Sequence, residues 1–244
     1  MWTIREIKSR AWEALRSYYW KAFLVSLVIA IAGGGFNFNY RTGSTSTGTG
    51  FPGGLDSISP AFIVLVAMAV LAGFLIFFAF HIFIGYPLEI GGRKYFVQAQ
   101  QNNEDMNYLG FAFNKSRYKD IIIAMIWRGF LNFLWYLLLI IPGIVMFYAY
   151  RMVPYILTDN PNIGYKRAVQ LSTQMMKGNK FHMFLLDLSF IGWLLLGVLA
   201  LFIGVLFVMP YINSAKAELY LVLRRNALAM GISNYDELQL EQSV

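Results

Sequence analysis

The feature that most constrains this chain is a series of apolar runs, several of which are long enough to cross a lipid bilayer. A membrane-spanning helix needs roughly 20 predominantly apolar residues. Of the 244 residues, 58% are hydrophobic and 14% are charged, whereas a soluble domain is about 45–50% apolar and about 25% charged. The sequence therefore predicts an all-α, polytopic membrane protein with six transmembrane helices. Their expected positions are about 21–36, 60–88, 119–140, 143–158, 181–198 and 203–223.

Two polar segments have the periodicity of amphipathic helices. In residues 3–18, Ile4, Ile7, Ala11 and Leu15 share one face, and Thr3 with Glu6 fits a capping box. We expect this helix to lie in the membrane interface; the alternative is a solvated extension of the first span. Residues 159–180 form the second such segment, and we expect a helix from Asp159-Asn160-Pro161 to a stop at Gly178.

The connections between spans carry clear turn and loop signals. Residues 37–59 are rich in Gly, Ser and Thr, which predicts a flexible outer loop. Pro142-Gly143 predicts a tight outer turn, and the region of Gly197–Gly204 predicts another. The inner end of the second span is expected at Gly85-Tyr86-Pro87, followed by a basic segment at 91–118. The tail at 224–244 is polar and is expected to be loosely held.

The distribution of basic residues orients the spans. Of the 20 Lys and Arg residues, Arg41 lies in an expected outer loop and Arg128 lies deep in a span. The other 18 fall in segments expected in the cytoplasm or at inner ends of spans, as the positive-inside rule requires. This pattern predicts that both termini are cytoplasmic. It also accounts for the net charge of +7 without a nucleic-acid partner.

The spans suggest a threefold internal repeat of one hairpin unit. Lys21, Lys119 and Lys180 each stand just before an odd-numbered span. Each even-numbered span ends with Pro and Tyr together, at Tyr86-Pro87, Pro154-Tyr155 and Pro210-Tyr211. We therefore predict three hairpins of like orientation, an arrangement that can frame a central site. The alternative is that these residue types simply gather at membrane interfaces.

Two ionisable residues lie inside expected spans, where a charge is costly without a partner. Arg128 lies in the third span and Asp187 in the fifth, at similar depth. We predict that they pair, with Asn132 one turn above Arg128 extending the polar face. A functional interpretation is a polar site or relay within the bundle. The alternatives are an ion pair that only fixes helix packing, and two residues that never meet.

Other residues give weaker signals. We expect interfacial or lipid contacts from Lys21, Lys119, Lys180, Arg93 and Lys94. His81 and His182 are isolated, so packed or interfacial positions are expected rather than a metal site. The chain has no Cys and none of the common hydrolase, metalloprotease or nucleotide-binding motifs. We predict no catalytic residue, no metal site and no cofactor.

Several of these residues resemble a known family. They include Ile141-Pro142-Gly143-Ile144, Pro154-Tyr155, Met176 to Lys180, and Pro210-Tyr211, with Leu188-Ser189-Phe190-Ile191-Gly192-Trp193 the most specific. They look like the bacterial membrane protein family called domain of unknown function 975, and Ala11 to Lys21 also fits. The resemblance covers nearly the whole chain, apart from the outer loop. It implies six spans, a bacterial plasma-membrane location and no transferable catalytic residue.

The sequence leaves three functional hypotheses. The leading one is a non-enzymatic membrane protein that acts as a small transport or membrane-homeostasis component. A second is an accessory or immunity-type protein that binds a partner helix or a membrane-active peptide. A third is an intramembrane lipid-modifying enzyme. Expected partners are the lipid bilayer, a lipid or small-molecule ligand, and a membrane protein partner. A transporter should have a polar cavity, whereas a partner-binding protein should present an exposed groove or a face of small residues.

Overall fold

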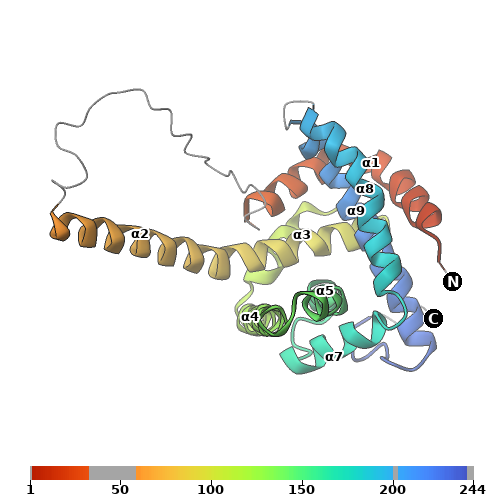
Figure 1. The fold of residues 1–244 in the computed structure, drawn as a ribbon. Helices are drawn as coiled ribbons and strands as arrows, with labels where there is room; N and C mark the ends of the chain where they lie inside the picture. The colour runs from red at the N-terminus through yellow and green to blue at the C-terminus, as the bar shows by residue number, and fades with distance from the viewer. Residues whose placement is uncertain (1, 33–58, 200–202, 241–244) are drawn as a thin grey trace.

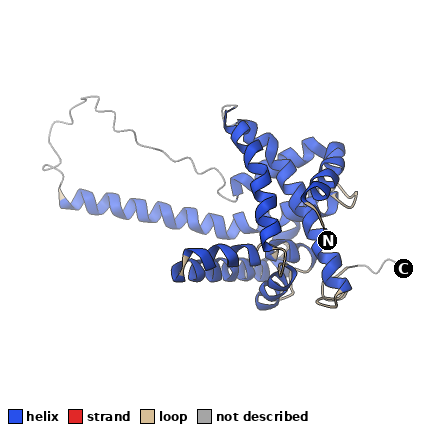
Figure 2. Ribbon diagram, turned by 45° about the vertical axis from the view of Figure 1, so that its right-hand side comes forward, coloured by secondary structure: helices blue, strands red, loops and turns tan. Residues whose placement is uncertain are grey.

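The computed structural model describes residues 2–32, 59–199 and 203–240, and the regular secondary structure in these residues is entirely helical (Figures 1 and 2). The expected all-α class is therefore confirmed. The elements are α1 (Ile4–Ala32), α2 (Pro60–Phe80), the π-helix η2 (His81–Gly85), α3 (Tyr86–Ala99), the 3₁₀ helix η3 (Met106–Phe113), α4 (Lys115–Leu138), α5 (Ile140–Ala149), α6 (Val153–Asp159), α7 (Tyr165–Met175), α8 (Lys180–Leu199) and α9 (Ile203–Ala229).

Helix α1 joins the expected amphipathic segment to the first apolar run. The Glu6 amide donates to Thr3 Oγ1 at 3.2 Å, which is one half of the expected capping box. Tyr18 has non-helical angles (φ −127°, ψ 23°), so the helix kinks where the two segments were expected to meet. The apolar face of the first half, including Ile7 and Leu15, is buried against other helices. This face therefore packs on protein and is not free to lie in a membrane interface.

Helices α2, η2 and α3 form one continuous rod, which corrects the expected end at Gly85-Tyr86-Pro87. Pro87 lacks an amide hydrogen, so it cannot bond to the carbonyl of Phe83 four residues earlier. Tyr118 from α4 donates its hydroxyl to that carbonyl at 2.8 Å. The π-turn is completed by the Tyr86 amide, which donates to the His81 carbonyl. The helix therefore passes the proline and continues to Ala99.

The fourth expected span consists of two helices, α5 and α6. The turn that precedes α5 lies earlier than the expected turn at Pro142-Gly143. The chain turns at Leu139, where φ is −161° and ψ is 144°, three residues before Pro142. Pro142 instead occupies the first turn of α5, where a missing amide hydrogen costs no helical bond. Gly143 is needed for close packing of α4 and α5, because a Cβ there would lie 2.5 Å from Tyr136 Cδ1.

A second break, between α5 and α6, is held by a side chain from α7. Ser172 Oγ donates to the Ala149 carbonyl at 2.7 Å and accepts from the Met152 amide at 3.1 Å. Both backbone groups are buried, and hydrogen bonding offsets the cost of burying them. The break leaves Arg151 outside regular helix, between α5 and α6.

The second amphipathic helix, α7, is shorter than expected. Residues 160–164 form a turn in which Asn160 Oδ1 accepts from the Asn162 amide at 2.9 Å. Gly164 then adopts φ +86°, and the helix begins at Tyr165. It ends at Met175, three residues before the expected stop, and Gly178 lies in the turn that follows, with φ +79°, a conformation that favours glycine.

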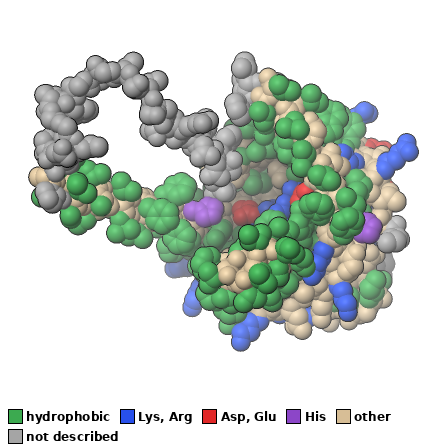
Figure 3. All heavy atoms as spheres, viewed as in Figure 1, with side chains coloured by type: hydrophobic (Ala, Val, Ile, Leu, Met, Phe, Trp, Pro, Cys, Tyr) green, Lys and Arg blue, Asp and Glu red, His purple; other side chains and the backbone are tan. Residues whose placement is uncertain are grey.

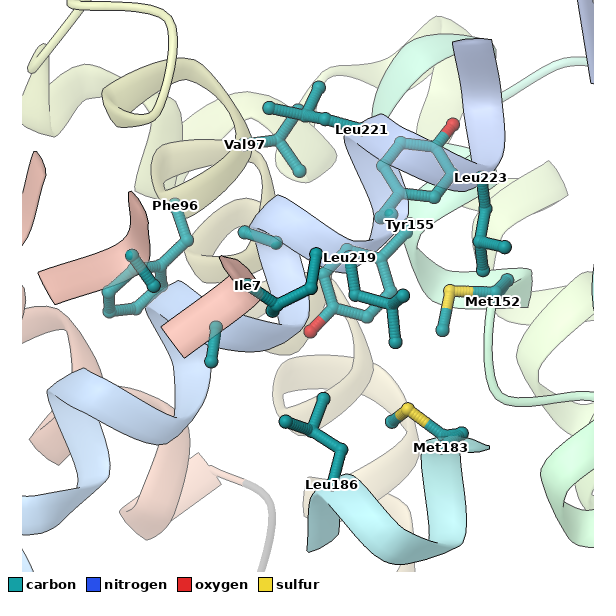
Figure 4. Close-up of a cluster of buried hydrophobic side chains, with 14 of the residues drawn as sticks. Ile7, Phe96, Val97, Met152, Tyr155, Met183, Leu186, Leu219, Leu221 and Leu223 are labelled. Atoms are coloured by element: carbon teal, nitrogen blue, oxygen red, sulfur yellow. The ribbon is translucent and has the colours of Figure 1, made fainter. Parts of the chain in front are cut away.

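The main core joins segments that are far apart in the chain (Figure 4). Ile7 of α1, Val97 of α3, Tyr155 of α6, Leu186 of α8 and Leu219 of α9 all contribute to it. Figure 1 shows α1 and α3 beside α8 and α9, whereas α2 extends away from this body.

The described part of the tail is docked, which corrects the expectation of a loosely held segment at 224–244. Helix α9 continues to Ala229, and Leu238 beyond it is fully buried. Asn160 Nδ2 donates to the Glu237 carbonyl at 2.9 Å. The sequence signal was misleading because this segment is polar overall, but its Leu238 belongs to the main core, and Ile232 and Leu240 pack against that core.

Five helical stretches of the described residues are long and apolar enough to cross a membrane: Ile4–Ile31, Ala61–Ala99, Lys115–Leu138, Ile140–Asp159 and Lys180–Leu199. Helix α9, the expected sixth span, is not among them. Helices α4 and α5 pack together, as do α8 and α9, whereas α1 packs mainly on α9 and α3. The count of six spans and the threefold repeat remain predictions. The expected outer loop at 37–58 and part of the turn near Gly197–Gly204 lie outside the described residues.

Hydrophobic side chains dominate the surface of the apolar helices (Figure 3). None of the residues in the most apolar window of Ala61–Ala99 is buried. Exposed side chains of α2 include Phe62, Leu71 and Ile76. An exposed apolar surface of this extent favours contact with lipid or with another apolar surface.

Candidate functional site

A carboxylate and a guanidinium lie one helical turn apart on α3. Arg93 Nε donates to Glu89 Oε1 at 3.0 Å. The Arg93 and Glu89 side chains are 19% and 13% exposed, so the pair is largely removed from solvent. The Arg93 guanidinium also lies over the Tyr155 ring of α6, 4.7 Å from its centroid. This pair lies on the part of α3 that follows Pro87.

A second carboxylate, Asp187 of α8, is shared by two cations. Lys216 Nζ of α9 lies 3.2 Å from Asp187 Oδ1, and Arg151 Nη2 lies 3.6 Å from Oδ2. Tyr148 of α5 directs its hydroxyl to the same Oδ2 at 3.4 Å. Two segments that are distant in sequence, residues 148–151 and α9, therefore converge on the carboxylate of α8.

These two groups form one set, which we call the central charged cluster: Glu89, Arg93, Arg128, Arg151, Asp187 and Lys216. Arg128 and Arg151 interact electrostatically with Glu89, and Lys216 interacts with Arg93 and Arg151. Figure 3 shows acidic and basic side chains in a hollow of the visible face, with hydrophobic side chains around it. The cluster is supplied by α3, α4, the break before α6, α8 and α9.

A pocket of about 320 Å³ adjoins the cluster. Its polar lining comes from Arg151, Asp187, Lys216 and Tyr148. Its apolar lining comes from α8 and α9, through Phe184, Leu188, Phe190, Ile191, Leu194 and Ile212. The pocket is therefore amphipathic.

The structure brings Arg128 and Asp187 into one cluster but does not pair them. Asp187 binds Arg151 and Lys216, while the close polar contact of Arg128 is Met125 Sδ, 3.8 Å from Nη1. The predicted ion pair is corrected by this arrangement, because the break after α5 brings Arg151 to Asp187. Asn132 is partly buried, and its Oδ1 has no hydrogen-bond partner in the described part of the chain.

The five residues expected at the interface fall into two groups. Lys21 pairs with Glu104 at 3.2 Å, and Lys119 is exposed, while Lys180 is partly exposed. Arg93 and Lys94, in contrast, face the interior. Lys94 Nζ donates to the Thr158 carbonyl at 2.7 Å and lies 4.0 Å from the centre of the Phe111 ring. The expectation for these two residues was wrong because the helical rod that starts as α2 does not end at Pro87 but continues as α3 into the core.

Sequence reasoning missed the roles of Glu89, Arg151 and Lys216. The spacing of Glu89 and Arg93 is that of an ion pair on one helical face, but the two residues pair only if 89–93 are helical, and the expected span ended just before them, at Gly85-Tyr86-Pro87. Arg151 and Lys216 were placed at inner ends of spans, where basic residues are ordinary. No sequence signal indicated that both would reach one carboxylate.

A separate group, which we call the Asp159 cluster, consists of Asp159, Tyr220 and Arg224. Tyr220 donates its hydroxyl to Asp159 Oδ2 at 2.6 Å, and Arg224 Nη1 donates to the same oxygen at 3.0 Å. The Asp159 and Arg224 side chains are 3% and 11% exposed. One carboxylate thus pairs with one guanidinium, and Lys94 also interacts electrostatically with Asp159.

The tail is joined to α7 by a third ion pair, nearer the surface. Arg167 Nε donates to Glu237 Oε1 at 2.6 Å. This hydrogen bond lowers the pKa of Glu237 and raises the pKa of Arg167. The pair therefore contributes to holding the tail when Glu237 is ionised.

The two histidines contact aromatic rings. The His81 ring lies 5.0 Å from that of Tyr86, and the His182 ring lies 5.6 Å from that of Trp2, measured between centroids. Among the described residues, no three His, Cys, Asp or Glu side chains are grouped so that they could hold a metal ion.

Comparison with known proteins gives one family. Residues 112–227 match the family described as "Protein of unknown function (DUF975)". This confirms the resemblance seen in the sequence, with one difference of extent: the match begins at Ala112 and does not include the segment from Ala11 to Lys21. No curated protein and no solved structure matches the chain. Arg128, Arg151, Asp187 and Lys216 fall within the matched region, whereas Glu89 and Arg93 precede it.

Proposed function

We propose that this chain, whose residues 112–227 belong to the family of unknown function DUF975, is a multi-pass bacterial plasma-membrane protein with both termini in the cytoplasm. It binds a small polar or charged group among its helices, and it acts in transport or membrane homeostasis and not as an enzyme. The observation that carries this proposal is the central charged cluster, which lies among helices whose outer surfaces are apolar.

The membrane location is supported by the contrast between the apolar outer surfaces of the helices and the paired charges among them. Five helical stretches have the length and apolar composition of membrane spans. Charged groups are costly in a bilayer unless they face the bundle interior and pair with one another. Arg93, Arg151 and Lys216 meet that condition, because each has a carboxylate within 4 Å.

The role in binding is supported by the pocket beside Asp187. A transport or binding protein needs a polar cavity between its helices, and the pocket has both a polar lining and a volume of about 320 Å³. A site of this kind commonly lies among facing helices in membrane transporters. For a lipid-modifying enzyme, a free acid or base would be required near the substrate, but Glu89 and Asp187 are both held by cations.

Single-cysteine labelling tests this proposal well, because the chain has no Cys of its own. We would introduce Ile212→Cys in the pocket, one turn before Lys216, and Leu71→Cys on the exposed surface of α2. Asn234→Cys, in the exposed part of the tail, reports the cytoplasmic side. Each variant is treated with a charged, membrane-impermeant maleimide in right-side-out and in inverted membrane vesicles.

The proposal predicts that Asn234→Cys reacts only in inverted vesicles and that Leu71→Cys, shielded by lipid, reacts in neither. Ile212→Cys should react from at least one side, because water reaches a binding pocket. If Leu71→Cys reacts as fast as Asn234→Cys, α2 does not lie in lipid. If Ile212→Cys reacts in neither preparation, water does not reach the pocket, and the proposed binding site is contradicted.

A further inference from the structure

The central charged cluster carries more positive than negative charge. Its cations are Arg93, Arg128, Arg151 and Lys216, and its carboxylates are Glu89 and Asp187. Four cations and two carboxylates leave two positive charges uncompensated. Like charges that share a site of low dielectric constant repel strongly, so a cluster of this composition favours an added anion.

Two of the guanidinium groups have unused donors. Arg151 Nε is buried and has no hydrogen-bond partner in the described residues. Arg128 Nη1 contacts Met125 Sδ at 3.8 Å, and a thioether is a weak acceptor. A buried donor without a partner costs free energy. An oxyanion that accepted from these groups would remove that cost.

The composition of the donors indicates which anion would bind. A guanidinium presents a planar fork of donors that matches phosphate and carboxylate oxygens in a bidentate manner. Two uncompensated charges match a phosphate monoester, which carries close to two negative charges near neutral pH. A carboxylate, with one charge, would leave the cluster unbalanced.

The pocket adds a second, independent indication. Arg151 and Lys216 line it beside Asp187, and its lining also includes apolar side chains of α8 such as Leu188, Ile191 and Leu194. Leu188 and Ile191 are themselves 47% and 44% exposed on the outer surface of α8. The pocket therefore places a phosphate group near cations and an attached hydrocarbon chain along α8, toward the lipid.

From these observations, and resting on the proposed membrane-embedded binding function, we infer that the central charged cluster binds a phosphate group. Arg151 and Lys216 hold the phosphate oxygens in the pocket, and Arg93 and Arg128 supply positive charge behind them. Two sources share this chemistry: the phosphomonoester headgroup of a lipid, and free inorganic phosphate. The apolar lining of the pocket favours the lipid, because it can contact the acyl chains attached to the headgroup.

Native mass spectrometry of the full-length protein, released in a mild detergent, tests this inference. The probes are dioleoyl phosphatidate and dioleoylglycerol, which have the same acyl chains and differ in the phosphate. We expect phosphatidate to bind in a one-to-one ratio and dioleoylglycerol to bind far more weakly. Arg151→Gln and Arg128→Gln should each weaken phosphatidate binding by roughly tenfold or more. Arg225→Gln, which changes an exposed residue near the end of α9, is the matched control and should bind as the wild type does.

Competition with inorganic phosphate separates the two sources. If inorganic phosphate displaces phosphatidate from the wild type but not from Arg151→Gln, the site binds free phosphate. If phosphate does not displace the lipid, the acyl chain takes part in binding. Equal binding of phosphatidate and dioleoylglycerol, or unchanged binding by Arg151→Gln and Arg128→Gln, would overturn the inference.

Two further measures keep the test decisive. Folding of each variant is checked by its helical circular dichroism and its elution as a single species. If Arg151→Gln does not fold, Arg128→Gln carries the test, because Arg128 has no carboxylate within ion-pair distance in the described residues. If the wild type does not bind phosphatidate although Ile212→Cys reacts with the maleimide, the phosphate inference alone is contradicted. An unreactive Ile212→Cys contradicts the proposed function itself.

Discussion

Two groups of charged side chains lie among these helices, and they differ in how fully their hydrogen-bonding groups are paired. In the Asp159 cluster, one carboxylate accepts short bonds from one guanidinium and one tyrosine hydroxyl. In the central charged cluster, four cations share two carboxylates, and a buried donor of Arg151 has no partner among the described residues. A carboxylate that pairs at short distance with both neighbours suits a structural role. A cluster with excess cations and an unpaired donor can accept an added anion.

The two clusters also differ in how they are built. Asp159 ends α6, and Tyr220 and Arg224 lie one turn apart on α9, so two elements suffice. The central cluster needs five segments, including the non-helical residues between α5 and α6. The break that places Arg151 there is fixed by Ser172, which bonds both Ala149 and Met152. The interruption between α5 and α6 therefore places a third arginine, Arg151, in the cluster.

The largest effect on stability is expected at the Asp159 cluster. Asp159→Asn leaves the largely buried Arg224 without a counter-charge, and breaking such a pair costs about 3 kcal/mol. Unfolding in detergent by increasing denaturant, followed by helical circular dichroism, measures the loss. Asp236→Asn is the control, because Asp236 is exposed, and it should change stability by less than about 0.5 kcal/mol. Equal stability of the two variants would refute the structural role.

A smaller effect is expected from the corresponding change in the central cluster. Arg93→Gln removes the hydrogen-bonded partner of Glu89, but Arg128 and Arg151 still interact with that carboxylate. We therefore expect a loss of about 1.5 kcal/mol, less than for Asp159→Asn in the same unfolding assay. A loss as large as that of Asp159→Asn would show that the cations of the central cluster are not redundant.

The ion pair of the tail gives a still smaller effect, and a pH dependence. Glu237→Gln removes a partly exposed pair and should cost about 0.5 kcal/mol near neutral pH. The pKa of Glu237 is lowered in the folded protein by its hydrogen bond to Arg167. The stabilisation is therefore present above the usual carboxyl pKa of 4.5 and is lost as the pH falls through the lowered value. The difference between wild type and Glu237→Gln should thus shrink below pH 4.5, and a difference that grows there would contradict this explanation.

The smallest effect on stability is expected at Arg128. Arg128→Gln removes a cation that has no carboxylate within ion-pair distance among the described residues and lies in the field of Arg93 and Arg151. Without ligand, the variant should be as stable as the wild type within about 0.5 kcal/mol, or slightly more stable. A loss of about 2 kcal/mol or more would mean that Arg128 is a structural residue. The assay is the same denaturant titration, with lipid-depleted protein.

The sequence predicted the helices well where local rules decide them. The turn at Gly178, the cap at Thr3 and the boundary near Tyr18 follow from glycine geometry, side-chain capping and hydrophobic periodicity. It misplaced the end of the second apolar run, because Tyr118 compensates the bond that Pro87 cannot make. That compensation comes from a residue 31 positions later, which no local pattern reveals.

The site was predicted in part for the same reason. Arg128 and Asp187 stood out because charges inside apolar runs are rare, and both belong to the central cluster. Their partners could not be predicted, because Arg151 reaches Asp187 only through the break after α5. Arg93 and Lys94 were assigned to the interface because the second span was expected to end at Pro87. The helix instead continues through α3.

The measurement that tests the contrast between the clusters most directly is the thermal shift that dioleoyl phosphatidate produces in three proteins. A ligand that binds only the folded state at 100 times its Kd stabilises by about 2.7 kcal/mol. We expect phosphatidate to raise the Tm of the wild type and of Tyr220→Phe, which alters only the Asp159 cluster, by the same amount. Arg128→Gln should show little or no shift. The account is contradicted if Arg128→Gln shifts as the wild type does, or if Tyr220→Phe loses the shift.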